Sequence, residues 1–365
     1  MSRPSVVTVD IQALRDNFLL AQSLAPQSKT MPMVKANAYG HGAIPVAKAL
    51  EDLAQAFGVA CIEEALDLRK AGIKLPILLL EGTYSAEEVP VAAQENLWLM
   101  VENQPQVEAI VRAKINSPVN VWIKLDTGMH RLGFPAQEAQ TIFNQLSASQ
   151  NVGEQIVLAT HFAWADSLTE SMTQQQLACF ESSIEVIKKQ NILQSLANSA
   201  SILGWPQTQR DWQRPGYMLY GNSPFSQPQV NANKLQPVMT FSSAIISIRT
   251  VQEGESVGYT ANWVADRTSQ IATIAVGYGD GYPRQAPNGT PVLIQGKECP
   301  IVGRVSMDMI TVDITDLAQA PSIGEPVILW GPQLPVNKIA SYCDTIGYEL
   351  LTRMPTRVPR IYINQ

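Results

Sequence analysis

The sequence is poor in the residues that build metal centres and disulfide frameworks. It has only four cysteines and three histidines in 365 residues. The cysteines stand far apart without a Cys-x-x-Cys pair, and no histidine has metal-ligand spacing to them. These absences argue against a disulfide-stapled secreted domain and against a multi-histidine metal centre. Reduced thiols in a cytoplasmic protein are the expectation.

Positive charge and long hydrophobic runs are also scarce. The net charge is −6, and no cluster of lysine and arginine is dense enough to neutralise a nucleic-acid backbone. The longest apolar runs, such as 77–80, fall far short of the roughly 20 residues of a membrane span. Arg3, Asp10 and Arg15 have no apolar stretch between them, so no secretory signal is expected. We therefore predict a soluble protein that binds neither nucleic acid nor membrane.

Short β-rich segments alternate with helical patterns from about residue 30 to 225. Amphipathic stretches over 43–54, 63–71 and 173–189 carry apolar residues at helical spacing. Eight strands separated by helices are the signature of a (β/α)8 barrel, an α/β fold. The predicted strands cover 30–36, 57–62, 76–81, 97–101, 119–126, 155–162, 196–199 and 214–220.

The pattern changes after residue 228. Strand-like runs at 239–249, 268–276, 290–294 and 325–330 are separated by turns rich in Gly, Pro and Asn, without long helices. We predict a barrel domain over residues 1–228 and a mainly β domain over 229–365. The first few residues can pack with the second domain.

Polar residues gather where the predicted barrel strands end, which is where barrels carry their catalytic groups. Lys35 ends the first strand, and burial there would depress the pKa of its amine. A neutral amine is what a Schiff base with an aldehyde requires, whereas the alternative is a surface lysine with a buried stem. The other polar residues at these ends are Lys124, Asp126, Arg131, His161, Asn198, Ser199 and Arg214.

A phosphate cradle is predicted after the eighth strand. Pro215 can occupy a first helical position, and Gly216 lets a backbone N–H approach an anion. Barrels often bind phosphate after strands seven and eight, where Ser199 could add a hydroxyl.

Several motifs together resemble the alanine racemase family of fold-type III pyridoxal 5′-phosphate (PLP) enzymes. The most specific are Val-Lys-Ala-Asn-Ala-Tyr-Gly-His-Gly at 34–42 and Lys-Leu-Asp-Thr-Gly-Met-His-Arg-Leu-Gly at 124–133. The resemblance covers essentially the whole chain. Shorter matching stretches, in the order and spacing of the family, lie at 197–200, 214–216, 257–259, 277–281 and 303–308.

The resemblance implies a cofactor site in the barrel. Lys35 would bind PLP covalently, and His161 would lie against the pyridine ring. Arg131 would reach the phenolic oxygen of PLP and the substrate carboxylate, aided by the Met307 backbone N–H. Lys124 matches a position that is carbamylated in many family members, where the added negative charge orients Arg131. The phosphate and its surroundings would be held by Tyr39, Asn198, Ser199, Gly216 and Tyr217.

The resemblance also implies a two-base mechanism shared between subunits. Racemisation removes a Cα proton on one face and returns one on the other, so a base is needed on each face. Lys35 would be one base, and Tyr259 from the partner subunit would be the other. The implied assembly is a homodimer with two shared active sites, with Met307 also crossing over. Tyr278 matches a narrow entrance gate, which favours a small substrate such as alanine.

Arg214 separates the reaction types that this fold can host. The resemblance implies that Arg214 faces the pyridine nitrogen of PLP. An arginine cannot accept a proton from that nitrogen, so the nitrogen should stay unprotonated. The carbanion is then less stabilised, and transamination is disfavoured. A fold-type III decarboxylase would need an acidic partner there and a reactive cysteine in the β domain. A non-catalytic PLP-binding protein would lack the β domain that carries Tyr259. A racemase with broader substrate specificity is a variant of the alanine racemase interpretation. The enzyme could supply D-alanine for peptidoglycan synthesis or serve alanine catabolism.

Two stretches depart from the common family pattern. Thr260-Ala261-Asn262-Trp263 follows Tyr259 where many relatives have Gly-Gly-Thr or Gly-Ala-Thr. Thr356 stands where some relatives have a phosphate-binding tyrosine. We expect an altered loop at the first position and a weaker or hydroxyl-made phosphate contact at the second.

Overall fold

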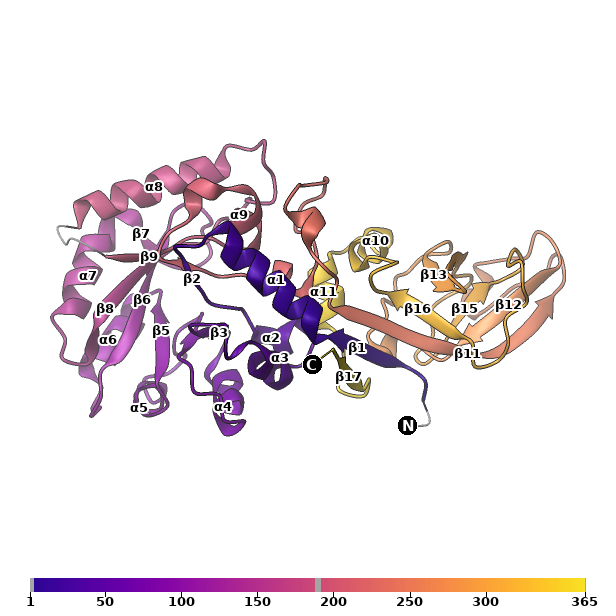
Figure 1. Ribbon diagram of the computed structural model, residues 1–365, viewed down its shortest axis with the longest axis horizontal. Coiled ribbons are helices and arrows are strands. Elements are labelled where there is room, and N and C mark those ends of the chain that lie inside the picture. The colour runs from indigo at the N-terminus through magenta and orange to yellow at the C-terminus, as the bar shows by residue number, and fades with distance from the viewer. Residues whose placement is uncertain (1–2, 188–191, 365) are drawn as a thin grey trace.

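The protein has two lobes arranged along its long axis (Figure 1). The computed structural model describes residues 3–187 and 192–364. One lobe is a barrel surrounded by helices, and the other is built mainly of strands. The long strand β11 (Met239–Val251) runs from the junction of the lobes into the β lobe.

Eight parallel strands form the barrel in the order β2-β10-β9-β8-β6-β5-β4-β3. The ring closes where Met33, just after β2, bridges Gly58 of β3. The Val34 N–H donates to the Gly58 carbonyl at 2.9 Å, and the Gly58 N–H donates to the Pro32 carbonyl at 3.1 Å. The predicted (β/α)8 barrel is confirmed. Its strands are β2 (Lys29–Thr30), β3 (Phe57–Val59), β4 (Ile77–Leu79), β5 (Leu97–Val101), β6 (Val119–Asp126), β8 (Val152–Ala159), β9 (Leu193–Ser195) and β10 (Trp212–Gln213).

Three of the predicted barrel strands are misplaced. The first strand does not include Lys35, which begins α2 (Lys35–Tyr39). Residues 196–199 are not a strand, because the Asn198 side chain accepts from the Ser201 N–H at 3.1 Å and starts α9 (Ser199–Gly204). Residues 214–220 are not a strand either, because Pro215 lacks an N–H for the sheet and the apolar residues after it form the buried 3-10 helix η3 (Tyr217–Tyr220).

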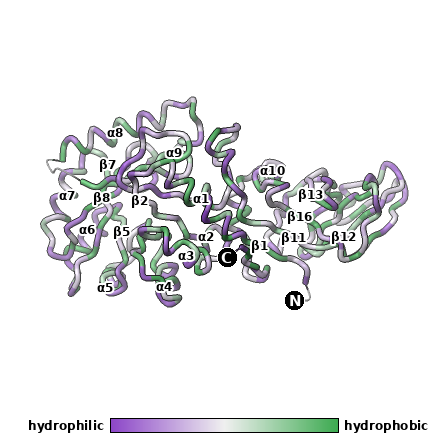
Figure 2. Tube along the Cα trace, in the orientation of Figure 1, coloured by the Kyte–Doolittle hydropathy of each residue, from purple (hydrophilic) through white to green (hydrophobic). Residues whose placement is uncertain are grey.

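The helices pack their apolar faces on the outside of the barrel. α8 (Met172–Val186) is an exception: hydrophobic and hydrophilic residues alternate along it (Figure 2), and its buried residues are Thr173, Gln176, Phe180 and Ser183. The end of the predicted helix 173–189 falls at residues 188 and 189, which lie outside the described residues. The remaining helices and short elements of this lobe are α1 (Ile11–Leu24), α3 (Ala43–Leu50), α4 (Ile62–Lys70), α5 (Glu88–Gln94), α6 (Gln104–Arg112), β7 (Phe134–Pro135), η1 (Ala136–Glu138), α7 (Ala139–Ser147) and η2 (Pro206–Thr208).

The barrel interior is filled by large side chains. Trp122 and Trp212 are buried there, and their ring centroids lie 5.6 Å apart. Met31, Met33 and Met100 fill the space around them. The interior is therefore a packed core, and the space for chemistry lies at the mouth, where the strands end.

The β lobe contains a sheet with the strand order β14-β13-β16-β11-β1-β17. β1 (Val6–Asp10) pairs antiparallel with β11 and parallel with β17 (Arg360–Ile363), so residues that precede the barrel belong to this sheet. Among the described residues, no helix combines the length and apolarity needed to cross a membrane. The other elements are η4 (Ala232–Lys234), η5 (Tyr259–Ala261), β12 (Ser269–Ile274), η6 (Tyr278–Asp280), β13 (Pro291–Ile294), β14 (Lys297–Pro300), β15 (Ile310–Asp313), β16 (Pro326–Trp330), α10 (Val336–Tyr342) and α11 (Gly347–Thr352).

Candidate active site

Lys35 stands at the barrel mouth, directly before a left-handed turn. The φ angles of residues 36–39 lie between 50° and 53°, a region that costs non-glycine residues about 1–2 kcal/mol each. The Glu64 carboxylate stabilises the turn by accepting from the Ala36 N–H at 2.7 Å and the Ala60 N–H at 2.8 Å. Such a strained segment persists only where its surroundings fix it, as at functional sites. Glu64 belongs to no recognisable sequence motif, so the sequence alone did not identify it as a site residue.

The amine of Lys35 is tuned by burial and by its charged neighbours. Burial lowers the pKa of Lys35, and the cations Arg131 and Lys124 lower it further, whereas Glu81 and Glu64 raise it. Burial is the largest of these effects. The unprotonated amine, which is the nucleophilic and basic form, is therefore more populated than on an exposed lysine.

Next to this lysine, hydroxyl and amide groups form an anion cradle. Ser199 Oγ accepts from the Gly216 N–H at 2.9 Å and from the Met218 N–H at 3.3 Å. A Cβ on Gly216 would lie 2.6 Å from the Tyr39 hydroxyl, so only glycine permits this approach. The Tyr39 hydroxyl has no hydrogen-bond partner within the described ranges, and burial raises the pKa of Tyr39 to about 12, which keeps it a donor. This set of hydroxyls and N–H groups fits a phosphate.

A residue that the sequence analysis missed, Tyr348, completes the surroundings of the cradle. Its ring stacks on Tyr217, with the centroids 3.6 Å apart, and lies 6.3 Å from the ring of Tyr39. Thr356, whose hydroxyl was expected to contact the phosphate in place of a tyrosine, is exposed. Tyr348 lies on α11, far along the chain from the cradle, so only the tertiary structure reveals it. Asn198 supports the cradle indirectly, because its capping bonds with Ser201 fix the turn that presents Ser199.

Arg214 is buried and held by three acceptors. Its guanidinium donates to Ser195 Oγ at 2.5 Å and to the carbonyls of Thr160 at 2.7 Å and Leu196 at 3.2 Å. Its Nε donates to no residue in the described part of the chain, so this N–H is available to a ligand. Burial lowers the pKa of Arg214 to about 10, which still leaves it cationic at neutral pH.

Lys124, Arg131 and His161 line one small cavity at the mouth. Burial lowers the pKa of His161 well below its usual value, and Arg214, Lys124, Arg131 and Lys35 lower it further. The imidazole is therefore neutral at pH 7. Arg131 is exposed and has no hydrogen-bond partner among the described residues, which leaves its guanidinium available to an anionic group.

Two acidic residues organise the strand ends around that cavity. Asp126 accepts from the Gly128 and His130 N–H groups, both at 3.0 Å, and so shapes the loop that carries Arg131. Glu102, which the sequence analysis did not single out, accepts from the Lys124 ammonium at 2.8 Å.

The predicted residues of the β lobe face solvent in the single chain. Tyr259 is 68% exposed, Met307 is 54% exposed and Tyr278 is 40% exposed. No described hydrogen bond or ion pair joins their side chains to the barrel mouth of the same chain. Beside Tyr259, Thr260 and Ala261 have φ angles of 63° and 48°. Glycine adopts this left-handed geometry without a steric cost, so Thr260 and Ala261 are strained there.

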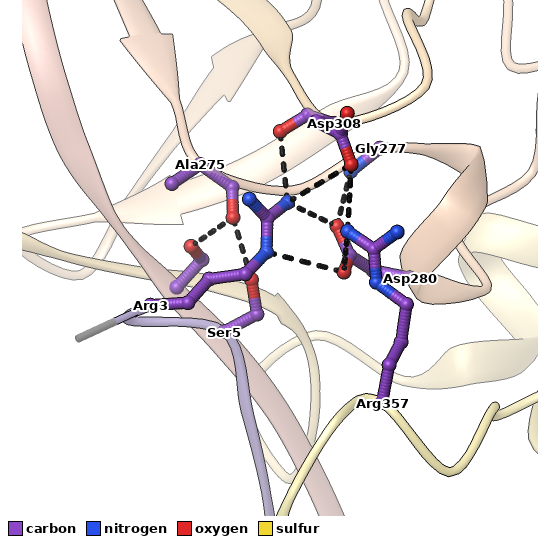
Figure 3. A network of polar contacts seen from close by, with 8 residues as sticks. Arg3, Ser5, Ala275, Gly277, Asp280, Asp308 and Arg357 are labelled. Carbon is purple, nitrogen blue, oxygen red and sulfur yellow. Dashed lines mark hydrogen bonds and ion pairs between the residues drawn. The ribbon is translucent and has the colours of Figure 1, made fainter. Parts of the chain in front are cut away.

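The buried carboxylate of Asp280 lies in a polar network with Arg3, Arg357 and Asp308 (Figure 3). Asp280 is fully buried and pairs with Arg3 at 2.6 Å and with Arg357 at 3.0 Å. The Tyr278 N–H donates to the Ser306 carbonyl at 3.0 Å, and the Gly279 N–H donates to the Met307 carbonyl at 2.8 Å. Arg3 also donates to the Asp308 carbonyl at 3.0 Å, and Arg357 pairs with the Asp308 carboxylate at 2.6 Å, so the two arginines link the loops of Tyr278 and Met307.

We expect Asp280→Asn to destabilise the β lobe by about 2–3 kcal/mol and to raise KM. Removing the shared partner of two arginines is costly when the site is buried, although both arginines are more than a third exposed, which lessens the cost. Urea unfolding and steady-state kinetics measure the two effects. Asp316→Asn, which breaks the exposed pair with Arg267, is the matched control and should cost less than about 1 kcal/mol. Equal effects of the two variants would contradict the role of Asp280.

A closed parallel barrel that presents a desolvated lysine beside a phosphate-sized cradle is the arrangement of the barrel class of PLP enzymes. The family model for the alanine racemase N-terminal domain matches residues 9–224, and that for the C-terminal domain matches residues 238–362. The chain belongs to the alanine racemase family.

Individual relatives match over the full length. The chain is 48% identical over 363 residues to the catabolic alanine racemase of Pseudomonas putida, with all of both chains covered. It superposes on the biosynthetic alanine racemase from Pseudomonas aeruginosa with a TM-score of 0.94 at 46% identity, covering 99% of each chain. It also resembles the alanine racemase from Bartonella henselae with covalently bound pyridoxal phosphate, with a TM-score of 0.90 at 32% identity and 99% of each chain covered. The predicted family, fold and isomerase class are confirmed.

Proposed function

We propose that this protein interconverts L-alanine and D-alanine with PLP, as a cytoplasmic homodimer that shares its active sites between subunits. The observation that carries the proposal is the placement of Lys35, desolvated, beside the cradle of Ser199, Gly216 and Tyr39, in a chain that matches alanine racemases from end to end. The names of the relatives include a catabolic and a biosynthetic enzyme. The same chemistry serves D-alanine supply for peptidoglycan and alanine breakdown.

The residues at the mouth fit the cofactor group by group. Lys35 supplies the amine for covalent attachment, and the hydroxyls of Tyr39 and Ser199 with the backbone N–H groups of Gly216 and Tyr217 hold the phosphate. Tyr348 stacks on Tyr217 and supports this edge. When bound, PLP delocalises the electron pair left on Cα after proton removal.

Two residues hold and move the proton. The Lys35 amine takes a proton from Cα on one face, and the Tyr259 phenol of the partner subunit donates one on the other. Both must lie within about 3 Å of Cα when substrate is bound. The reverse direction exchanges their roles.

Arginines and a neutral histidine set the reaction type. Arg131 binds the substrate carboxylate, aided by the Met307 N–H of the partner subunit. Arg214 would face the pyridine nitrogen as a hydrogen-bond donor that cannot accept its proton, and the neutral imidazole of His161 would pack against the ring. Without a carboxylate to keep the ring nitrogen protonated, racemisation would be favoured over transamination and decarboxylation.

The shared site explains the exposure of the β-lobe residues. Tyr259, Met307 and Tyr278 are conspicuous on the surface of one chain, and a second copy would place them over a barrel mouth. We retain the division into a barrel domain over 1–228 and a β domain over 229–365, in which β1 pairs with the sheet of the β domain.

Incubating purified protein separately with L-alanine, L-serine and L-lysine tests the proposal. D-alanine should form fastest, by about tenfold or more over the other D-isomers, because the Tyr278 gate excludes larger side chains. Chiral chromatography of the products measures this. Loss of the carboxylate from L-lysine, or equal rates for all three substrates, would contradict the assignment.

A further inference from the structure

Side-chain donors hold the backbone of the left-handed turn that follows Lys35. The carbonyls of Ala38 and Tyr39 accept from Nδ1 of His41 at 3.0 and 2.9 Å. The next two carbonyls, those of Gly40 and His41, accept from side chains of β17, which lies at the junction of the two lobes (Figure 1). Four consecutive carbonyls are therefore held, two from within the turn and two from a strand of the β-lobe sheet.

His41 holds the inner side of the turn as a buried, neutral imidazole. Burial lowers the pKa of His41 to about 4, so at neutral pH one ring nitrogen carries a hydrogen, and Nδ1 is the one that faces carbonyls. Its ring stacks on Tyr220 with the centroids 4.4 Å apart, and Tyr220 stacks in turn on Tyr39 at 4.8 Å. The ring of Tyr39, whose hydroxyl belongs to the anion cradle, is thus packed through the same turn.

Arg360 holds the outer side of the turn from β17. Its Nε donates to the Gly40 carbonyl at 2.8 Å. Its other nitrogens donate to the carbonyls of Met354 at 2.9 Å, Val358 at 3.1 Å and Pro355 at 3.3 Å. The guanidinium therefore joins the turn to the segment that precedes β17. A lysine ammonium lacks the rigid, planar set of donors that such a contact needs.

Tyr362 holds the next carbonyl of the turn. Its hydroxyl donates to the His41 carbonyl at 3.0 Å. Arg360 and Tyr362 are two residues apart on β17 and so share a face of the strand, whereas Ile361, on the other face, is 45% exposed. β17 pairs with β1, and β1 pairs with β11. The sheet of the β lobe therefore fixes where the two donors stand.

Two glycines let the C-terminal segment approach the turn. A Cβ on Gly40 would clash with the Leu351 carbonyl oxygen, and a Cβ on Gly42 would clash with the Tyr362 hydroxyl. Their φ angles are 81° and 102°, which glycine adopts without strain. The Gly-His-Gly end of the motif at 34–42 is thus explained by its contact with the C-terminal segment.

We propose that Arg360 and Tyr362 are positioning residues, which hold this turn from the β lobe and thereby fix Lys35 and Tyr39 against the cofactor. The proposal deepens the proposed function and rests on it for the roles of Lys35 and Tyr39. The turn is strained at residues 36–39, so it needs such contacts to persist. Loss of one donor should let it open locally while the barrel and the sheet stay folded.

Amide hydrogen exchange in the full-length holoenzyme tests the proposal without turnover. The amides of residues 40–42 donate to carbonyls of residues 36–38, so their exchange reports opening of the turn. In Tyr362→Phe and in Arg360→Lys they should exchange about tenfold faster than in the wild type, the usual effect of one lost hydrogen bond. PLP should also be released about tenfold faster on dilution, which the absorbance of the bound cofactor measures.

Tyr342→Phe and Arg249→Lys, at exposed positions of the β lobe, are the matched controls and should keep the wild-type values. A merely structural role of β17 would lower only the urea midpoint, so wild-type exchange at residues 40–42 or wild-type PLP release in either test variant would overturn the proposal. If Arg360→Lys does not fold, Tyr362→Phe, which loses a single hydroxyl, decides. A failure of the racemase assignment would appear separately, as absent D-alanine.

Discussion

Lys35→Ala should lower the rate of alanine racemisation by at least about 10⁴-fold, because it removes a base from one face of Cα and the amine that attaches the cofactor. The structure supports this with the burial and cationic neighbours that lower the pKa of Lys35. Conversion of L-alanine to D-alanine measures the loss, with added PLP to exclude simple cofactor depletion.

Borohydride reduction identifies the attachment point independently of turnover. In the wild type, peptide mapping should find the cofactor on Lys35, and Lys35→Ala should carry none. Lys114→Ala, at an exposed lysine outside the mouth, should label and turn over as the wild type. A label on any other lysine in the wild type would refute the role of Lys35.

Tyr259→Phe should lower racemisation by about 10²- to 10⁴-fold, the usual contribution of one acid or base, while leaving proton exchange intact on the opposite face. Lys35 is retained in this variant, so the enantiomer whose Cα proton faces Lys35 should still exchange that proton with deuterium. The other enantiomer should not.

Proton NMR of L-alanine and D-alanine in deuterated buffer, run separately, measures the two exchange rates. Tyr342→Phe, at an exposed tyrosine of the same lobe, is the matched control and should leave both rates unchanged. Equal losses for the two enantiomers in Tyr259→Phe would contradict the assignment of one base to each face.

The sequence predicts the site residues that lie in short local motifs. Lys35, Ser199 and Gly216 lie in short motifs at strand ends, and the barrel brings all strand ends to one mouth, so their grouping follows from the fold. The strand boundaries near 196 and 214 were wrong because capping by Asn198 and the missing N–H of Pro215 override the apolar runs that follow them.

What could not be predicted depends on contacts between distant segments. Glu64 and Glu102 act through the neighbouring strand ends, Tyr348 reaches the cradle from α11, and Asp280 joins the two ends of the chain. None of these residues belongs to a pattern whose spacing indicates its partner. Their roles appear only once the tertiary structure is known.

Mixing Lys35→Ala with Tyr259→Phe tests most directly whether each active site draws on two chains. Each variant alone should be nearly inactive, but a mixed dimer contains one site with both the intact lysine and the partner's intact tyrosine. After dissociation and reassociation of equal amounts, activity should return to about a quarter of the wild-type value, since about half of the dimers are mixed and each has one working site. A mixture that stays as inactive as its components, although mixed dimers are shown to form, would contradict the account.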